Sequence, residues 1–267
     1  MPPTLAWNEE PNMKTAGTVH SSHAKILADR LQARMATVGV VGFGHLSLPL
    51  ATAFARVGFN VRGIDADARG ADLFGGVESD IVEVATHRSA EGVKSETLRQ
   101  SRQYVHLADC DAIVICMPAP LRKNRHPDLS YIVAAIDSIV PVARRGQCLV
   151  LESTTFPGTT RKVVLPRLEE RGFEVGRDIF LAFSPERIDL GDPRFGFTKA
   201  PRVIGGCTPV CSSLAATLYG AISESIVEVS SLEAAEMARC LEITFLSVNI
   251  GLVNEVAPLC SRMKLEV

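Results

Sequence analysis

The sequence predicts a doubly wound α/β domain with a parallel sheet, followed by a long helix of a different character. Short continuous runs of Val, Ile and Leu, typical of strands buried on both faces, alternate with amphipathic stretches of helical length. A Gly-x-Gly segment directly follows the first of these runs, where such a domain makes its first tight turn. Residues 230–267 instead keep apolar side chains at helical spacing almost without interruption.

The elements of this domain are expected to alternate along the chain. Residues 1–22 form a tail that we expect to be disordered, and 24–34 form an amphipathic helix that leads into the sheet. Strands are expected at 37–41, 60–64, 111–117, 148–153 and 179–183, with helices between them at 46–57, 130–143 and 158–171. The more polar stretch 66–104 is expected to hold one or two helices and a short strand near Tyr104. After 202–206 we expect a helix at 208–220 and a last strand at 225–230, so that the domain covers residues 23–229.

The segment 230–267 is predicted to be one long helix. Ser230 and Glu233 stand at the spacing of a capping box, and the apolar periodicity that follows is interrupted by Gly251 and Pro258. We expect a kink at Pro258. A helix this long and this apolar is not stable alone, so we expect it to pack against another domain or subunit.

Composition excludes several classes of protein. With 46% apolar and 22% charged residues, the chain matches soluble globular proteins, and a net charge of −2 gives no basis for nucleic-acid binding. The polar N-terminus lacks the features of a signal peptide, and the longest apolar region, residues 36–59, is broken by glycines and charges, which argues against a membrane span. Seven cysteines without a C-x-x-C pair indicate a reduced, cytoplasmic protein, and no metal-ligand spacing is present.

The run Gly42-x-Gly44-x-x-Ser47 predicts a dinucleotide site. It follows an apolar strand and opens a helix, which is the context that gives a G-x-G-x-x-G pattern its meaning. The first glycine allows the tight turn, the second lets the backbone approach a pyrophosphate at the helix N-terminus, and a small serine is a mild change at the third. We therefore predict a Rossmann-like domain. The residues expected beside the pyrophosphate are Gly42, Phe43, Gly44, His45 and Leu46.

Asp65 predicts which dinucleotide this site prefers. It ends the second expected strand, where an acidic side chain accepts hydrogen bonds from the adenosine ribose and repels a 2′-phosphate. NAD is therefore expected in preference to NADP, with Arg69 near the adenosine side. The alternative interpretation is that the glycines merely form a turn and that Asp65 caps a helix.

Six segments together resemble the UDP-glucose/GDP-mannose dehydrogenase family, and within it the bacterial UDP-N-acetylhexosamine dehydrogenases. They are "ATVGVVGFGHLSLPLATAFARVGFNV", "VICMPAPL", "PDLSYI", "LESTTFPGTT", "FLAFSPERIDLG" and "EITFLSVNIGLVNE". The resemblance implies an NAD domain, a long central helix used for homodimerisation and a C-terminal domain that helps to bind the nucleotide sugar. It further implies oxidation of the C6 hydroxyl of a UDP-sugar with NAD, through a cysteine thioester, in polysaccharide biosynthesis.

The resemblance also assigns candidate site residues. Pro118, Ser153 and Thr154 are expected beside the nicotinamide end of NAD, with Thr155 completing the same "STT" run. Glu186 matches the family's glutamate, which assists the attack of water on the thioester. The alternative interpretation of Glu186 is a surface carboxylate paired with Arg187. The expected contacts to the substrate are Arg187 and Asn249.

Three positions depart from the family pattern. Ala119 stands in place of a threonine, and Arg239 and Ile243 stand where the family helix carries lysine and, one turn later, asparagine. Arginine keeps the positive charge, so Arg239 is predicted as a catalytic residue, but it does not release a proton near neutral pH. Isoleucine offers no hydrogen bond to an oxyanion.

Two hypotheses follow. The sequence stops at Val267, ahead of the Gly-Gly-x-Cys segment that carries the family's catalytic cysteine, so we expect the C-terminal domain to be absent and the oxidation to be incomplete. The first hypothesis is a weakened nucleotide-sugar dehydrogenase. The second is a catalytically inactive NAD-binding subunit with a regulatory or scaffolding role.

Overall fold

The structure, a computed structural model, describes residues 22–42, 47–65, 98–123, 126–186 and 201–266, together with the backbone of 82–83. Several predicted features lie outside the described residues. They are the N-terminal tail up to residue 21, the pyrophosphate residues Phe43, Gly44, His45 and Leu46, and the two arginines Arg69 and Arg187.

The predicted doubly wound α/β sheet is confirmed. The described strands form one sheet in the order β3-β4-β2-β1-β5-β6-β7-β8-β9. Their bounds are β1 Thr37–Val41, β2 Asn60–Ile64, β3 Val82–Glu83, β4 Leu98–Ser101, β5 Ala112–Ile115, β6 Cys148–Leu151, β7 Phe180–Phe183, β8 Arg202–Gly206 and β9 Ile226–Val229. The sheet is mostly parallel, with two antiparallel pairs, because β3 pairs antiparallel with β4 and β8 pairs antiparallel with β7.

The burial of each strand explains its sequence. Every residue of β5, β6 and β7 is buried, as expected for central strands with helices on both faces, which accounts for their continuous Ile, Val and Leu runs. β9, at the edge, is only half buried and carries a glutamate. β1 lies between β2 and β5, so the strand order reverses at β1, and this is the place where doubly wound sheets bind ligands.

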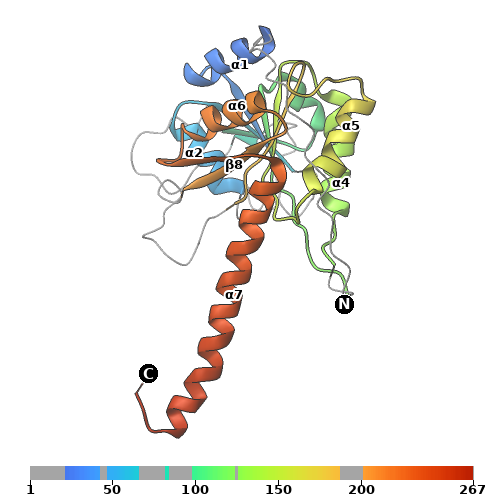
Figure 1. Ribbon diagram of the computed structural model, residues 1–267. Helices are drawn as coiled ribbons and strands as arrows, with labels where there is room; N and C mark the ends of the chain where they lie inside the picture. The colour runs from blue at the N-terminus through green and yellow to red at the C-terminus, as the bar shows by residue number, and fades with distance from the viewer. Residues whose placement is uncertain are drawn as a thin grey trace.

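Helices cover both faces of the sheet (Figure 1). One core contains side chains from α1 (Ser22–Gln32), α2 (Ser47–Arg56) and α6 (Pro209–Tyr219). The other contains side chains from α4 (Ser130–Ile139), α5 (Leu165–Glu170) and the start of the last helix. Shorter turns are the 3₁₀ helices η3 (Tyr104–Asp109) and η4 (Val140–Val142) and the π-helix η5 (Thr160–Val164).

The predicted strand near Tyr104 is wrong. Residues Tyr104–Asp109 form the 3₁₀ helix η3, and the strand is β4, which begins six residues earlier at Leu98. The parallel partner β2 takes residues Leu98–Ser101 in register, so the chain has already left the sheet at Tyr104. In η3 only Leu107 is buried, and one apolar contact per turn suits a short helix better than a strand in a buried sheet.

The long C-terminal helix is confirmed as α7, Leu232–Arg262, and it continues beyond Pro258. Its N-cap is Ser231 rather than Ser230, since the backbone N–H of Ala234 donates to the Ser231 hydroxyl at 3.1 Å. Figure 1 shows α7 leaving the body of the protein and extending away from it. By length and composition alone, α7 is the one helix of the described residues that could cross a membrane, a criterion that the core helices of soluble proteins also meet.

Candidate functional site

The candidate site lies along one edge of the sheet, where the parallel strands end. Neighbouring strands β2, β1, β5, β6 and β7 all run in the same direction, so the residues that follow them come to one edge. In the order of the sheet these residues are Asp65, Gly42, Pro118, Ser153 with Thr154, and Glu186. The structure therefore brings together six of the predicted cofactor and catalytic residues.

Gly42 can only be a glycine in this fold. Its φ of +87° lies in the left-handed region, and its N–H donates to the carbonyl of Ile64 at 2.8 Å. A Cβ at this position would lie 2.7 Å from the carbonyl oxygen of Cys116, the residue that directly follows β5. The backbone of the first turn thus passes directly over the next strand, which is the geometry that brings backbone N–H groups close to a phosphate. Ser47, at the third position of the pattern, is buried at the start of α2.

Asp65 marks the adenosine end of the edge. Its backbone N–H donates to the carbonyl of Ser101 at 3.2 Å, which fixes the end of β2 against the end of β4. Tyr104 lies near enough for its pKa to be raised, first by its own burial and then by the charge of Asp65. The side chain of Asp65 is half-buried, so it remains reachable from the edge.

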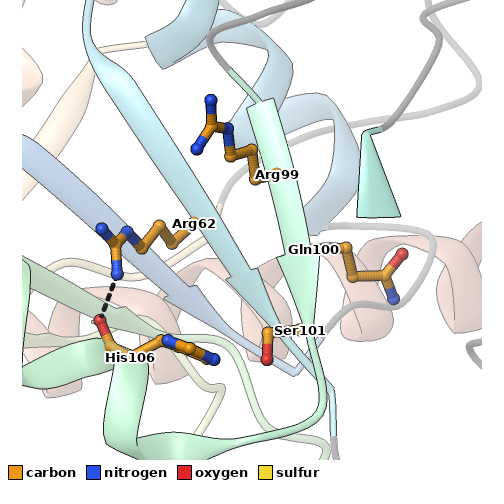
Figure 2. Close-up of a pocket in the computed structure, with 5 residues that line it drawn as sticks. All are labelled: Arg62, Arg99, Gln100, Ser101 and His106. Atoms are coloured by element: carbon orange, nitrogen blue, oxygen red, sulfur yellow. Dashed lines mark hydrogen bonds between the residues drawn. The ribbon is translucent and has the colours of Figure 1, made fainter. Parts of the chain in front are cut away.

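A small pocket lies between β2, β4 and η3 (Figure 2). Arg62 and Arg99 are paired in register on neighbouring strands, and both line this pocket with Ser101 and His106. The Arg62 guanidinium is already engaged, since it donates to the carbonyl of His106 at 3.2 Å and to Asp109 at 3.0 Å. Arg62 thus joins β2 to η3 through both of these contacts.

Pro118, Ser153 and Thr154 form the middle of the edge. Pro118 and Thr154 are exposed, whereas Ser153 is buried and its hydroxyl donates to the carbonyl of Ile115 at 3.3 Å. This bond ties the exit of β6 to the exit of β5. The expected nicotinamide residues therefore follow two neighbouring strands, and β5, the first of these, lies beside β1 and Gly42.

Glu186 belongs to a buried ionic network that the sequence does not reveal. Its carboxylate lies 3.8 Å from Nη2 of Arg202, whose Nη1 donates to the carboxylate of Glu152. β8 runs antiparallel to β7, with Ala182 paired to Gly206 and Phe183 to Gly205, so the start of β8 lies on the side of the β7 exit. Arg202 reaches Glu186 because β8 returns beside the exit of β7. Arg187, the partner in the alternative interpretation of Glu186, lies outside the described residues.

Tyr219 and Cys116 complete this network. The Tyr219 hydroxyl donates to Glu152 at 3.0 Å, the Cys116 thiol lies 3.8 Å from the same carboxylate oxygen, and the Arg202 guanidinium stacks 4.7 Å from the centre of the Tyr219 ring. Burial lowers the pKa of Arg202, but the interactions with Glu152, Tyr219 and Glu186 together outweigh burial and raise the pKa, so Arg202 stays charged. Burial and Glu152 both raise the pKa of Tyr219, which stays protonated as a donor.

The three candidate residues of α7 lie at different distances from this edge along the helix. Arg239 is mostly buried and lies 3.5 Å from Glu242, one turn along the same helix. Ile243 is exposed, and the amide of Asn249 donates to the carbonyl of Phe245 in its own helix at 2.7 Å. Within the part of the chain that the structure describes, Asn249 lies on the projecting length of α7 and is not brought to the edge.

The cysteine thiols near the site are not activated. Burial raises the pKa of Cys116, Cys207 and Cys240, whereas a nucleophilic cysteine needs a lowered pKa. In Cys116 the charges of Glu152 and Glu186 raise it further. Among the described residues no group of three His, Cys, Asp or Glu side chains could hold a metal ion.

Comparison with known proteins identifies the domain. A model of the UDP-glucose/GDP-mannose dehydrogenase family, NAD binding domain, matches residues 36–223, which is more than half of the chain. The chain belongs to the UDP-glucose/GDP-mannose dehydrogenase family. The matched domain is the family's NAD binding domain, and NAD is its cofactor.

Individual members of the family match over the same region. The UDP-N-acetyl-D-mannosamine dehydrogenase of Escherichia coli (strain K12) is 35% identical over 240 residues, 87% of this chain and 56% of that protein. The UDP-N-acetyl-D-glucosamine 6-dehydrogenase of Pseudomonas aeruginosa is 33% identical over 235 residues, 86% of this chain and 54% of that protein. The structure of a UDP-N-acetyl-mannosamine dehydrogenase from Staphylococcus aureus superposes with a TM-score of 0.72 at 31% identity and covers 85% of this chain and 55% of that one. The chain thus spans about half the length of these relatives.

The residues present fit NAD. The turn at Gly42 leaves no room for a side chain, β1 lies where the strand order reverses, and a carboxylate ends β2. The turn at Gly42 admits a pyrophosphate, and the carboxylate of Asp65 suits a ribose diol. Sequence reasoning missed Glu152, Arg202 and Tyr219, because their roles depend on neighbours between 16 and 67 positions away in the chain.

Proposed function

We propose that this protein is an NAD-dependent dehydrogenase that acts on the C6 hydroxyl of a UDP-sugar in polysaccharide biosynthesis. The observation that carries the proposal is the row of residues from Asp65 through Gly42, Pro118 and Ser153 to Glu186 along one sheet edge. The names of the relatives support a nucleotide sugar as the substrate.

In this proposal each part of the edge holds one part of the reactants. Asp65 accepts hydrogen bonds from the adenosine ribose, and the turn at Gly42 carries the pyrophosphate. Pro118, Ser153 and Thr154 border the nicotinamide, which accepts a hydride from the alcohol carbon when NAD is bound. The substrate then lies on the side of β7, next to Glu186.

Two charged residues define what the substrate end can do. Glu186 presents a carboxylate beside the β7 exit, 3.8 Å from Nη2 of Arg202. Arg239 supplies a positive charge that stabilises a developing alkoxide without exchanging its own proton. Because burial raises the pKa of Cys116, Cys207 and Cys240, these thiols do not serve as thioester nucleophiles. The step that the described edge residues support is one hydride transfer, which converts the alcohol to an aldehyde.

We further propose a cytoplasmic homodimer that forms through α7. The exposed apolar side chains of α7 cover more than half of its circumference, wider than the single stripe of an ordinary surface helix. They form two neighbouring stripes, which are Leu241, Phe245, Val248, Leu252, Val256 and Leu259, and Ile243, Leu246, Ile250 and Val253. The polar side is narrow and contains Thr244, Ser247, Asn254 and Glu255. A surface of this width suits a helix that packs against its own copy and against a second body at the same time.

Titration calorimetry and a product assay test the enzymatic proposal. We expect NAD to bind, and a UDP-N-acetylhexosamine to yield one NADH per sugar with an aldehyde that hydroxylamine traps as an oxime. Two NADH per sugar would show that the chain completes the oxidation to the acid. NAD binding without any NADH from a panel of UDP-sugars would instead favour an inactive NAD-binding subunit.

Sedimentation velocity tests the dimer. Leu252→Glu places a charge in the middle of the apolar stripe and is expected to give a monomer, whereas Ser247→Glu on the polar side is the matched control and is expected to leave the dimer intact. A monomeric wild type, or a wild type that partitions into vesicles, would contradict the proposed homodimer.

A further inference from the structure

Glu236 is a fully buried carboxylate in the second turn of α7, and the edge residues described above do not include it. Its two oxygens accept hydrogen bonds from the backbone N–H of Gly158, from the N–H of Thr160 at 2.8 Å and from the Thr160 hydroxyl at 2.7 Å. A buried charge is costly unless it is fully hydrogen-bonded. The hydrogen bonds named above all come from residues 158–160, in another part of the chain.

Gly158 lies four residues after Thr154, the last of the expected nicotinamide residues. Thr160 begins η5, so Glu236 lies at the N-terminus of the helical stretch η5–α5, where unpaired N–H groups favour a negative charge. Gly158 has a φ of +91°, and the turn between Phe156 and Thr159 is closed by an N–H···O bond of 3.1 Å. The position of this turn therefore determines how the chain returns from Thr154 to the helix.

A second contact from the same face of α7 reaches the same segment. The Cys240 thiol, one helical turn after Glu236, donates to the carbonyl of Thr155 at 3.4 Å. α7 therefore contacts this part of the chain at Thr155, at Gly158 and at Thr160. The Thr155 hydroxyl is buried and, among the described residues, has no hydrogen-bond partner.

We propose that Glu236 is a positioning residue for cofactor binding, which holds the segment Ser153–Gly158 in the shape that contacts the nicotinamide half of NAD. This inference rests on the proposed placement of NAD along the edge. The adenosine half is held by β1 and β2, which Glu236 does not touch. Loss of the Glu236 contacts therefore weakens the binding of the nicotinamide half and leaves the binding of the adenosine half unchanged.

The test compares NAD with ADP-ribose, which lacks the nicotinamide, in the full chain. Glu236→Gln keeps the size of the side chain but turns an N–H₂ donor toward an N–H donor of the segment. We expect its ratio of NAD affinity to ADP-ribose affinity to fall about tenfold, with ADP-ribose affinity unchanged. Glu233→Gln, one turn earlier on α7 and paired with Arg161, is the matched control and is expected to keep the wild-type ratio.

Two milder variants and a hydrogen-exchange measurement test the same contacts, and the variants can be used if Glu236→Gln does not fold. Thr160→Val and Cys240→Ala each remove one hydrogen bond and are expected to lower the ratio about threefold. Hydrogen exchange of the peptide that covers 153–160 is expected to speed up in Glu236→Gln and not in Glu233→Gln.

A wild-type affinity ratio in Glu236→Gln and Thr160→Val, or unchanged exchange in this peptide, would overturn the inference. Failure of the wild type to bind NAD would instead contradict the proposed function, and the exchange measurement would then decide by itself whether Glu236 positions the segment.

Discussion

The two ends of the candidate site are built in different ways. At the adenosine end, Gly42 and Asp65 act through backbone geometry and one side chain at the surface. At the β7 end, Glu152, Arg202 and Glu186 act as a buried network of charges, with relative exposures of 2%, 4% and 9%. The first arrangement depends on residues that are close in sequence, and the second on strands that meet only in the folded sheet.

The adenosine end and the β7 end are therefore expected to tolerate changes in sequence to different degrees. Ser47 replaces a glycine at the adenosine end without loss of the fold, because a small side chain fits at the start of α2. At the β7 end, substitution of one charged residue of the network leaves its partner charge buried without compensation. Such a charge is among the costliest defects in a protein interior. Four experiments test whether the two ends of the site differ in this way.

The largest effect is expected from Arg202→Met. This substitution leaves the carboxylates of Glu152 and Glu186 buried without their cation, and we expect the free energy of unfolding to fall by about 3 to 5 kcal/mol. Urea denaturation measures the loss. The matched control is Arg161→Met, which breaks a half-exposed pair with Glu233 and is expected to cost less than about 1 kcal/mol. Equal losses in the two variants would remove the distinction between buried and surface charges.

Gly42→Ala is expected to have the next largest effect, on NAD affinity. Alanine would have to adopt a φ of +87° with its Cβ 2.7 Å from the Cys116 carbonyl oxygen. We expect NAD affinity to fall by about a hundredfold, because strain and displacement of the turn together cost roughly 3 kcal/mol. Gly172→Ala is the control, since Gly172 has the same backbone conformation, φ +88°, with nothing within 4 Å of its Cβ. NAD affinity that falls equally in both variants would show that the approach to β5 is unimportant.

Asp65→Asn is expected to change specificity more than affinity. The wild type should prefer NAD, because the carboxylate repels the 2′-phosphate of NADP. Removal of the negative charge is expected to narrow this preference by about tenfold, which calorimetry with both dinucleotides can measure. A wild type that binds NADP as tightly as NAD would contradict the assignment of Asp65.

The smallest effect is expected from the pH dependence of the surface pair. The hydrogen bond from Arg161 lowers the pKa of Glu233 below its ordinary value of 4.5. The stabilisation is therefore complete above pH 4.5 and is lost as the pH falls through the lowered pKa of the folded state. The difference in Tm between wild type and Glu233→Gln should be a few degrees or less at pH 7 and should vanish at low pH. A difference that grows on acidification would contradict this pairing.

Several features could be predicted from local sequence, with errors of recognisable cause. The central strands and α7 were predicted because burial on both faces and helical periodicity leave continuous patterns. The strand near Tyr104 was misplaced because the chain leaves the sheet earlier, where β2 ends. Ser231 rather than Ser230 caps α7, since two adjacent serines offer equal caps and the end of β9 decides between them.

The doubly wound fold, the place of the dinucleotide turn and the family resemblance could all be predicted from the sequence, because each depends on patterns that are local within a strand, a turn or a short motif. Only the tertiary structure decided that Glu186 pairs with Arg202 and that Glu236 holds the turn at Gly158. Both contacts join segments that are 16 to 78 positions apart, and the register of antiparallel β8 and the docking of α7 set them. Charges that are buried must find partners in three dimensions, and no local pattern records which partner the fold will supply.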